Sequence, residues 1–274
     1  MTEQTFSDPI AQGYYRQGES EISTTQSADD VLQKADALAR QDSRANLMHA
    51  SCYYLAAAHF LEARDPVKSA HAYHQAGHQL QQLDQFIHAA RAFLQAGAWA
   101  EQAARNGVTA STQQHLQHAA VRSYSRANHC FAEAGELDES ESAYLKERDA
   151  RVAWAKMQGK HPLALLAWKT TSNYGTSIPR WTAWILGTIM LFSLLYEVFF
   201  RVQWLQPMSN TNPSAWIPLW SGLYYAINIT SSLALVEYQP THPIAQAIVI
   251  LNVIAGYLFL GIGIGIVGQL IKNR

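Results

Sequence analysis

Charge and cysteine are both scarce in this sequence of 274 residues. Charged residues make up 15% of the chain, against roughly 25% in typical soluble proteins. The formal net charge is −1, so the chain lacks the basic surface that a nucleic-acid partner requires. Cys52 and Cys130 are the only cysteines, which excludes a disulfide-rich scaffold. Because no signal-peptide pattern opens the sequence, we expect both thiols to be reduced and buried in cytoplasmic helices.

The charges that are present lie mostly in the first two-thirds of the chain. Residues 202–271 contain a single formally charged residue, Glu237. A water-exposed surface cannot be built from such a composition, whereas a lipid-exposed surface can. The sequence therefore predicts a water-soluble part followed by a membrane part.

The water-soluble part divides into a tail and a helical domain. Residues 1–27 are rich in Ser, Thr, Gln, Glu and Gly and show no periodic apolar face, which predicts a disordered tail. Residues 28–160 are dominated by Ala, Gln, Leu and His, and Pro66 is their only proline. This composition, with almost no β-branched runs, is typical of helices.

Three related segments recur within the helical domain. They lie at 57–63, 90–96 and 127–134, and place a phenylalanine between small residues at Phe60, Phe93 and Phe131. Gly97 and Gly135 follow the second and third segments, where we expect each to end a helix. The pattern resembles tetratricopeptide repeats, and its Ala-rich character is closer to the SNAP-type variant. The resemblance implies an α-solenoid that binds a peptide or a neighbouring subunit.

No catalytic or cofactor-binding set of residues emerges from the helical domain, so we expect no enzyme activity, no cofactor and no metal site. His71, His74 and His78 share one helix face, but no Cys or carboxylate stands at a matching offset to complete a metal site. No helix-borne H-E-x-x-H motif is present either. These histidines are therefore expected to be solvated or packed between helices.

The membrane part follows a cytoplasmic connector over residues 161–180 and occupies residues 181–274. Spans are expected at 181–200 and 244–271, each long enough to cross about 30 Å of hydrocarbon. Glu197 lies near the end of the first span, where we expect it to reach the membrane interface. Between the spans, residues 216–230 are too apolar for a loop and too short to span comfortably. Such a segment is typical of a re-entrant pore helix.

Residues 223–240 read L-Y-Y-A-I-N-I-T-S-S-L-A-L-V-E-Y-Q-P. The segment resembles the pore loop of bacterial two-transmembrane potassium channels, in which two aromatics and a short helix precede T-T-L/V-G-Y/F-G-D-x-x-P. The resemblance implies a filter and pore lining formed by Thr230, Ser231, Ser232, Leu233, Ala234, Leu235, Val236 and Glu237. It also implies an inner helix that bends at Gly256 and Gly261, and a homotetramer around one pore.

The two filter glycines of the family are replaced by Ala234 and Val236. A left-handed backbone costs an L-residue about 1–2 kcal/mol, and a β-branched residue more. A fourfold carbonyl cage selective for potassium is therefore disfavoured. Glu237 takes the place of the family's aspartate, and four copies would form a charged ring that favours cations without discriminating sharply among them.

The sequence thus predicts an all-α protein with a cytoplasmic α-solenoid and a two-helix pore domain. The expected function is a cation channel, gated or docked through the solenoid, whose partners are monovalent cations, the lipid bilayer, other copies of the chain and a protein. The Lys and Arg flanking the spans place both termini in the cytoplasm and the protein in the inner membrane. Two alternatives stay open. One is a non-conducting membrane-anchored scaffold whose helical repeats bind a protein, and the other is a topology in which residues 215–236 form a third full span.

Overall fold

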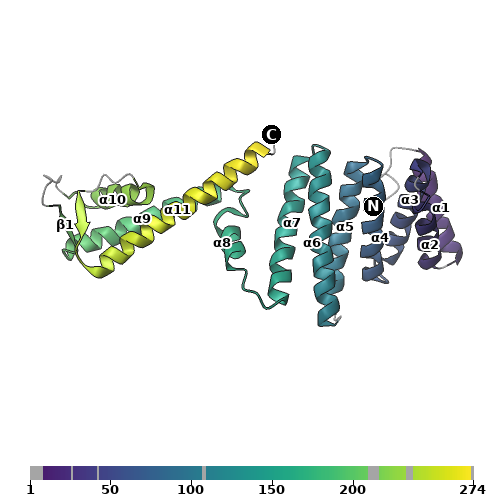
Figure 1. The fold of residues 1–274 in the computed structure, drawn as a ribbon, viewed down its shortest axis with the longest axis horizontal. Coiled ribbons are helices and arrows are strands. Elements are labelled where there is room, and N and C mark those ends of the chain that lie inside the picture. Colours follow the sequence, from purple (N-terminus) through teal and green to yellow (C-terminus); the bar gives the residue numbers. More distant parts are fainter. Residues whose placement is uncertain are drawn as a thin grey trace. The chain divides into compact units, whose positions relative to one another are not determined.

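The computed structural model of the protein describes residues 9–25, 27–41, 43–106, 109–208, 216–232 and 237–272. These residues are mostly helical, as expected for the all-α class, with one pair of three-residue strands (Figure 1). The chain divides into two compact units, Met1–Leu166 (unit 1) and Ala167–Arg274 (unit 2).

Unit 1 is built from successive helices joined by short turns. The helices are α1 (Pro9–Thr25), α2 (Ala28–Ala39), α3 (Arg44–Leu61), α4 (Pro66–Gln82), α5 (Phe86–Arg105), α6 (Ala110–Glu133) and α7 (Leu137–Met157). From α2 onward each helix packs against the next, and α1 packs against α3. Local capping fixes several starts: the Asp65 carboxylate accepts bonds from the Val67 and Lys68 amides, with Pro66 in the first turn.

The disordered tail expected over residues 1–27 is wrong for residues 9–25, which form α1. Ala11, Tyr15 and Ile22 are buried on one side of this helix, and the Cys52 thiol donates to the Ala11 carbonyl at 3.4 Å. The buried face of α1 contains only a few apolar residues in an otherwise polar segment, so the composition of residues 1–27 did not indicate a helix. Packing against α3 supplies the stabilisation that local propensity lacks. Both cysteines are free and buried, as predicted.

In two consecutive interfaces of unit 1, a glycine of one helix packs against an aromatic ring of the next. A Cβ added to Gly77 in α4 would lie 2.8 Å from the Phe93 ring of α5, and one on Gly97 in α5 would lie 2.6 Å from the Tyr124 ring of α6. Gly97 therefore lies inside α5 and does not end it, contrary to expectation. Gly135, with φ +78°, does follow the end of α6 as predicted.

The recurring segments do not mark the same helix of successive pairs, because they fall on α3, α5 and α6. A different spacing matches the packing better. A similar five-residue segment occurs in two consecutive helices, as Tyr73-His-Gln-Ala-Gly77 in α4 and as Phe93-Leu-Gln-Ala-Gly97 in α5. In both segments the glycine contacts an aromatic ring of the following helix, and in the second the Phe93 ring also contacts Gly77 of the preceding helix.

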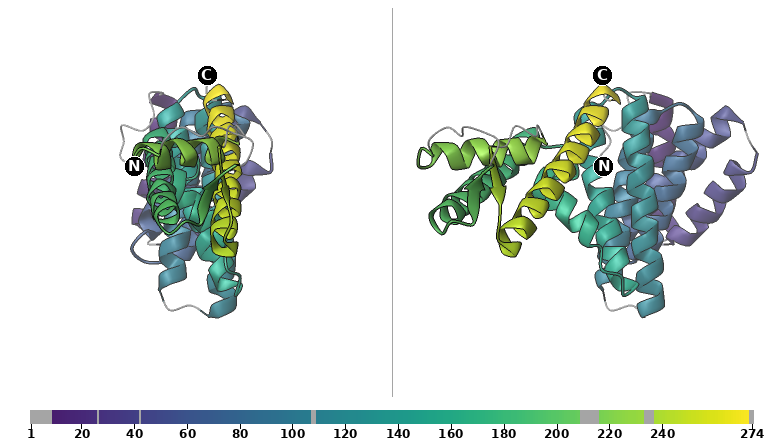
Figure 2. Two further views of the ribbon diagram at one scale, coloured as in Figure 1. Left: turned by 90° about the vertical axis from the view of Figure 1, so that its left-hand side faces the viewer. Right: turned by 60° about the vertical axis from the view of Figure 1, so that its left-hand side comes forward.

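Unit 2 contains α8 (Leu163–Ser172, which begins just before the boundary), α9 (Ile178–Arg201), β1 (Leu205–Pro207), α10 (Trp220–Ser231), β2 (Tyr238–Pro240) and α11 (Pro243–Lys272). Among the described residues two helices are long and apolar enough to cross a membrane, Ile178–Arg201 with mean hydropathy 1.8 and Pro243–Gly268 with mean hydropathy 2.4. They correspond to the two expected spans. The shorter α10 lies against both of them (Figure 2).

Strands β1 and β2 join the chain after α9 to the chain before α11. They pair antiparallel with Leu205 opposite Pro240 and Pro207 opposite Tyr238. The Thr241 amide extends this junction by donating to the Trp204 carbonyl at 2.9 Å. This pairing was not predicted, because three-residue strands that contain proline are too short to show an alternation of apolar and polar residues.

Candidate functional site

The candidate site is the region around α10, where the short helix meets both long apolar helices. Two glycines allow its close approach. A Cβ added to Gly222 in α10 would lie 2.7 Å from the Ser193 carbonyl oxygen of α9, and one on Gly256 in α11 would lie 2.0 Å from the Thr230 carbonyl oxygen of α10. Since backbone atoms cannot rotate away, only glycine fits at Gly256 without moving a helix.

A buried polar network joins the same three helices next to Gly256. Asn252 of α11 and Tyr196 of α9 are both 0% exposed, and the Asn252 amide donates to the Tyr196 hydroxyl at 3.0 Å. The Thr230 hydroxyl lies 2.8 Å from the Asn252 side-chain oxygen and 2.8 Å from the Ala226 carbonyl. Burying an amide among apolar groups is costly unless it is hydrogen-bonded. The network therefore favours one arrangement of the three helices.

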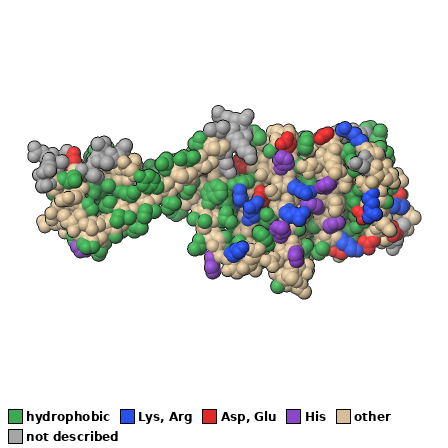
Figure 3. Space-filling view, in the orientation of Figure 1, with side chains coloured by type: hydrophobic (Ala, Val, Ile, Leu, Met, Phe, Trp, Pro, Cys, Tyr) green, Lys and Arg blue, Asp and Glu red, His purple; other side chains and the backbone are tan. Residues whose placement is uncertain are grey.

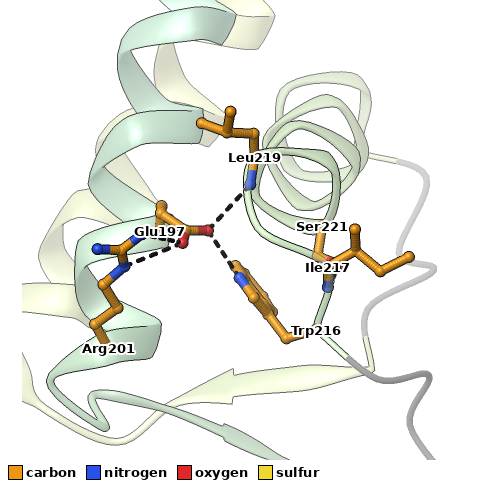
Figure 4. Close-up of polar contacts among 6 residues, drawn as sticks. All are labelled: Glu197, Arg201, Trp216, Ile217, Leu219 and Ser221. Atoms are coloured by element: carbon orange, nitrogen blue, oxygen red, sulfur yellow. Dashed lines mark hydrogen bonds and ion pairs between the residues drawn. The ribbon is translucent and has the colours of Figure 1, made fainter.

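The start of α10 is held by the carboxylate of Glu197, which is 7% exposed (Figure 4). Arg201 donates to it at 3.1 and 3.2 Å, the Trp216 indole at 2.8 Å and the Leu219 amide at 3.4 Å. The negative charge lies at the amino end of α10, where the helix dipole favours it. Glu197 is thus enclosed by unit 2 and does not reach outward to an interface as the sequence suggested.

The end of α10 carries the first residues of the predicted filter. Thr230 and Ser231 form its last turn, and Ser232 ends the helix in the left-handed conformation at φ 55°. Leu233, Ala234, Leu235 and Val236 lie outside the described residues. Glu237 is half-buried beside β2, and its backbone carbonyl accepts from the Met208 amide at 3.0 Å. Thr230 at the start of the predicted filter is therefore part of α10, and Glu237 at its end is bonded to the chain next to β1.

A hydrogen bond connects the body of α10 to the returning strand, because the Tyr225 hydroxyl donates to the Tyr238 carbonyl at 3.3 Å. Tyr225 also packs edge-to-face on Tyr196, with ring centroids 4.7 Å apart. The aromatic cluster continues from α9 to β2 and leaves α10 little freedom to move alone.

The predicted hinge glycines differ in their surroundings. α11 runs as a continuous helix through both Gly256 and Gly261. Gly256 packs against α10, whereas a Cβ on Gly261 or on Gly265 would meet no atom within 4 Å. Bending at Gly256 and Gly261 stays a prediction. Close packing within unit 2 explains Gly256 by itself, but Gly261 and Gly265 lie on an open surface.

Asn252 and Tyr196 are the site residues that sequence reasoning missed. A signal was present for Asn252, since an amide in the middle of an apolar span is expensive and marks a polar partner inside the protein. Tyr196 carried no comparable signal, because tyrosine is common in membrane helices. No group of three or more His, Cys, Asp or Glu able to hold a metal ion occurs among the residues that the structure describes.

Comparison of the chain with models of known protein families finds no match, and neither curated proteins nor solved structures give a significant one. The functional conclusion therefore rests on the geometry of α10 and its two neighbours.

Proposed function

We propose that the protein is a pore-loop membrane protein that conducts cations. Unit 2 spans the membrane with α9 and α11, and α10 enters it as a re-entrant pore helix. Twelve residues of helix cover about 18 Å, well short of the roughly 30 Å of a hydrocarbon core. A helix of this length does not cross the membrane by itself, and the pairing of β1 with β2 brings the chain before α10 and the chain after it back together at the start of α11.

The observation that carries this proposal is the attachment of the end of α10 to α11. The contact of Gly256 with the Thr230 carbonyl and the hydrogen bond between Thr230 and Asn252 hold the helix end at the middle of the span. Non-helical backbone at that depth is tolerated only where protein or water encloses it. One chain cannot enclose its own loop, so the proposal includes a homotetramer with the loops at its axis.

The exposed surfaces of α9 and α11 support membrane insertion and assembly. Large apolar side chains more than half exposed include Leu186, Leu191, Ile250, Tyr257 and Ile264. A surface of this kind is characteristic of contact with lipid or with other subunits. The Lys and Arg pattern supports a topology with both termini on the cytoplasmic side of an inner membrane.

Unit 1 is proposed to act as a cytoplasmic helical-repeat domain, an α-solenoid that docks a partner or senses a signal. Its helices pack in chain order from α2 onward, and the contact of Gly77 with Phe93 between α4 and α5 is repeated by Gly97 with Tyr124 between α5 and α6. An array of this kind has mostly nearest-neighbour interfaces and presents extended surfaces for binding.

A non-conducting, membrane-anchored scaffold is the second candidate. Ala234 and Val236 favour it, because they stand where a potassium filter uses glycine. In that case unit 2 would assemble the oligomer and the helical repeats of unit 1 would carry the function by binding a protein.

Conductance of the full chain distinguishes the two. The purified protein is reconstituted into planar bilayers under K⁺, Na⁺ and Cl⁻ gradients, and its mass is measured in detergent. We expect four copies and a cation-preferring conductance with little K⁺/Na⁺ discrimination. Glu237→Gln should shift the reversal potential toward no cation preference, whereas Glu141→Gln, the same change on exposed α7, should leave it unchanged. A tetramer without conductance would favour the scaffold, and a stable monomer would exclude both.

A further inference from the structure

Unit 1 contains a groove of about 590 Å³ between α4 and α6, with α5 beneath it. Ala96 and Ala100 of α5 form the floor, and their small side chains leave the space open. The polar residues along its walls are His71, His74, Gln75, His78 and Gln79 from α4 and Arg122, Ser123 and Arg126 from α6. Lys, Arg and His side chains gather on this face of unit 1 (Figure 3).

The groove is positively charged and holds no compensating acid, since no Asp or Glu lines it among the described residues. Two guanidinium groups stand one helical turn apart on α6, where they can act on one ligand. Three imidazoles face them from α4. Uncompensated cationic donors around a concave surface favour an anion, and paired guanidinium groups suit the oxygen geometry of phosphate.

His74 connects the two walls. Arg126 lies 3.4 Å from its Nε2 and can only donate, so Nε2 is the acceptor and the neutral ring carries its proton on Nδ1. Nδ1 then donates to the Ser123 hydroxyl at 3.0 Å. Burial first, and then the charges of Arg126 and Arg122, lower the pKa of His74 to about 4. The ring is therefore neutral at pH 7 and could gain charge if an anion offset the two arginines.

From this geometry we infer that the groove between α4 and α6 binds a phosphate-bearing small molecule, with Arg122 and Arg126 holding the phosphate. Its volume lies within the range of about 300–1,000 Å³ for small-molecule sites. A free phosphate would leave most of the groove empty, so a phosphate ester whose organic part lies between the helices fits better. The site belongs to unit 1 and does not depend on whether unit 2 conducts ions.

Calorimetric titration of the full chain in detergent tests this inference, with inorganic phosphate, ribose 5-phosphate, acetate and a hexaglutamate peptide as probes. We expect ribose 5-phosphate to bind more tightly than phosphate, and acetate and the peptide to bind negligibly. The double variant Arg122→Gln/Arg126→Gln should weaken ribose 5-phosphate binding at least tenfold. Arg91→Gln/Arg105→Gln removes the same charge outside the groove and should have no effect; circular dichroism checks that both variants are folded.

A second readout is proton uptake on binding, obtained by repeating the titration at pH 6 in buffers of different ionisation enthalpy. His71, His74, His78, Arg122 and Arg126 are the titratable and charged groups that face the phosphate. A bound phosphate should raise the pKa of His74, so the wild type should take up more protons, or release fewer, than His74→Gln. Absence of phosphate-ester binding at millimolar concentration, equal binding by the Arg122/Arg126 variant, or binding of the peptide alone would overturn the inference.

Discussion

Gly256→Ala should break the attachment of α10 to α11. The added methyl carbon would lie 2.0 Å from the Thr230 carbonyl oxygen, and ordinary contact begins at 3.4 Å, so the two helices must separate by about 1.4 Å. The oxygen is a backbone atom and the position of the Cβ is fixed by the backbone of α11, so no side-chain rotation can relieve the clash. Separation would also lengthen the hydrogen bond between Thr230 and Asn252 beyond its 2.8 Å.

We expect Gly256→Ala to lower the free energy of unfolding by about 3 kcal/mol or more. This is at or above the upper end of the usual range for overpacking, because an entire helix must shift. Unfolding of the full chain in detergent, followed by tryptophan fluorescence, measures it, since six of the eight tryptophans lie in unit 2. Gly261→Ala is the matched control, because a Cβ there meets no atom of the chain within 4 Å. A Gly256→Ala protein as stable as the wild type would refute the close-packing explanation and favour a purely flexible role.

Three further changes test other contacts of the structure. Asn252→Leu should destabilise unit 2 by about 1–3 kcal/mol in the same assay, because it leaves the buried Tyr196 hydroxyl without the hydrogen bond from Asn252; no loss would contradict a stabilising network. Glu197→Gln should weaken the bond from the Trp216 indole and change the fluorescence of that residue, with a loss of about 1–2 kcal/mol; an unchanged spectrum and stability would count against it. Folding lowers the pKa of His74 from 6.5 to about 4. At pH values between these two, the unfolded chain therefore binds a proton at His74 that the folded chain does not. Stability of unit 1, followed by circular dichroism, should therefore fall by about 2 kcal/mol as the pH drops from 7 to 4, allowing for partial exposure; His74→Gln should flatten this dependence, and an equally steep slope in the variant would assign it to other groups.

Features that depend on local composition were predictable. The helical character of residues 28–160 follows from Ala, Gln and Leu content, and the two apolar helices follow from long uncharged stretches. The end of α6 was also predictable, because Gly135 adopts a backbone conformation that other residues avoid. In each case the residues that decide the structure lie close together in the sequence.

The candidate site was predictable in part. Thr230, Ser231 and Glu237 stand out from the motif alone, and the structure places the first two at the end of a short helix and the third before β2. The attachment of Thr230 to Asn252 and to Gly256 was not predictable, since it requires the relative position of two helices and joins residues at least 22 positions apart.

The sequence by itself determined that residues 28–160 are helical, that two long segments are apolar, and where charge is absent, because each of these follows from the composition of contiguous segments. Only the tertiary structure decided the remaining points. It ordered α1 against α3, placed Gly97 inside a helix as the site for Tyr124, and enclosed Glu197 at the start of α10. It also brought histidines of α4 opposite arginines of α6. The physical reason is that these contacts join residues from different helices, and their energies exist only once the helices have packed.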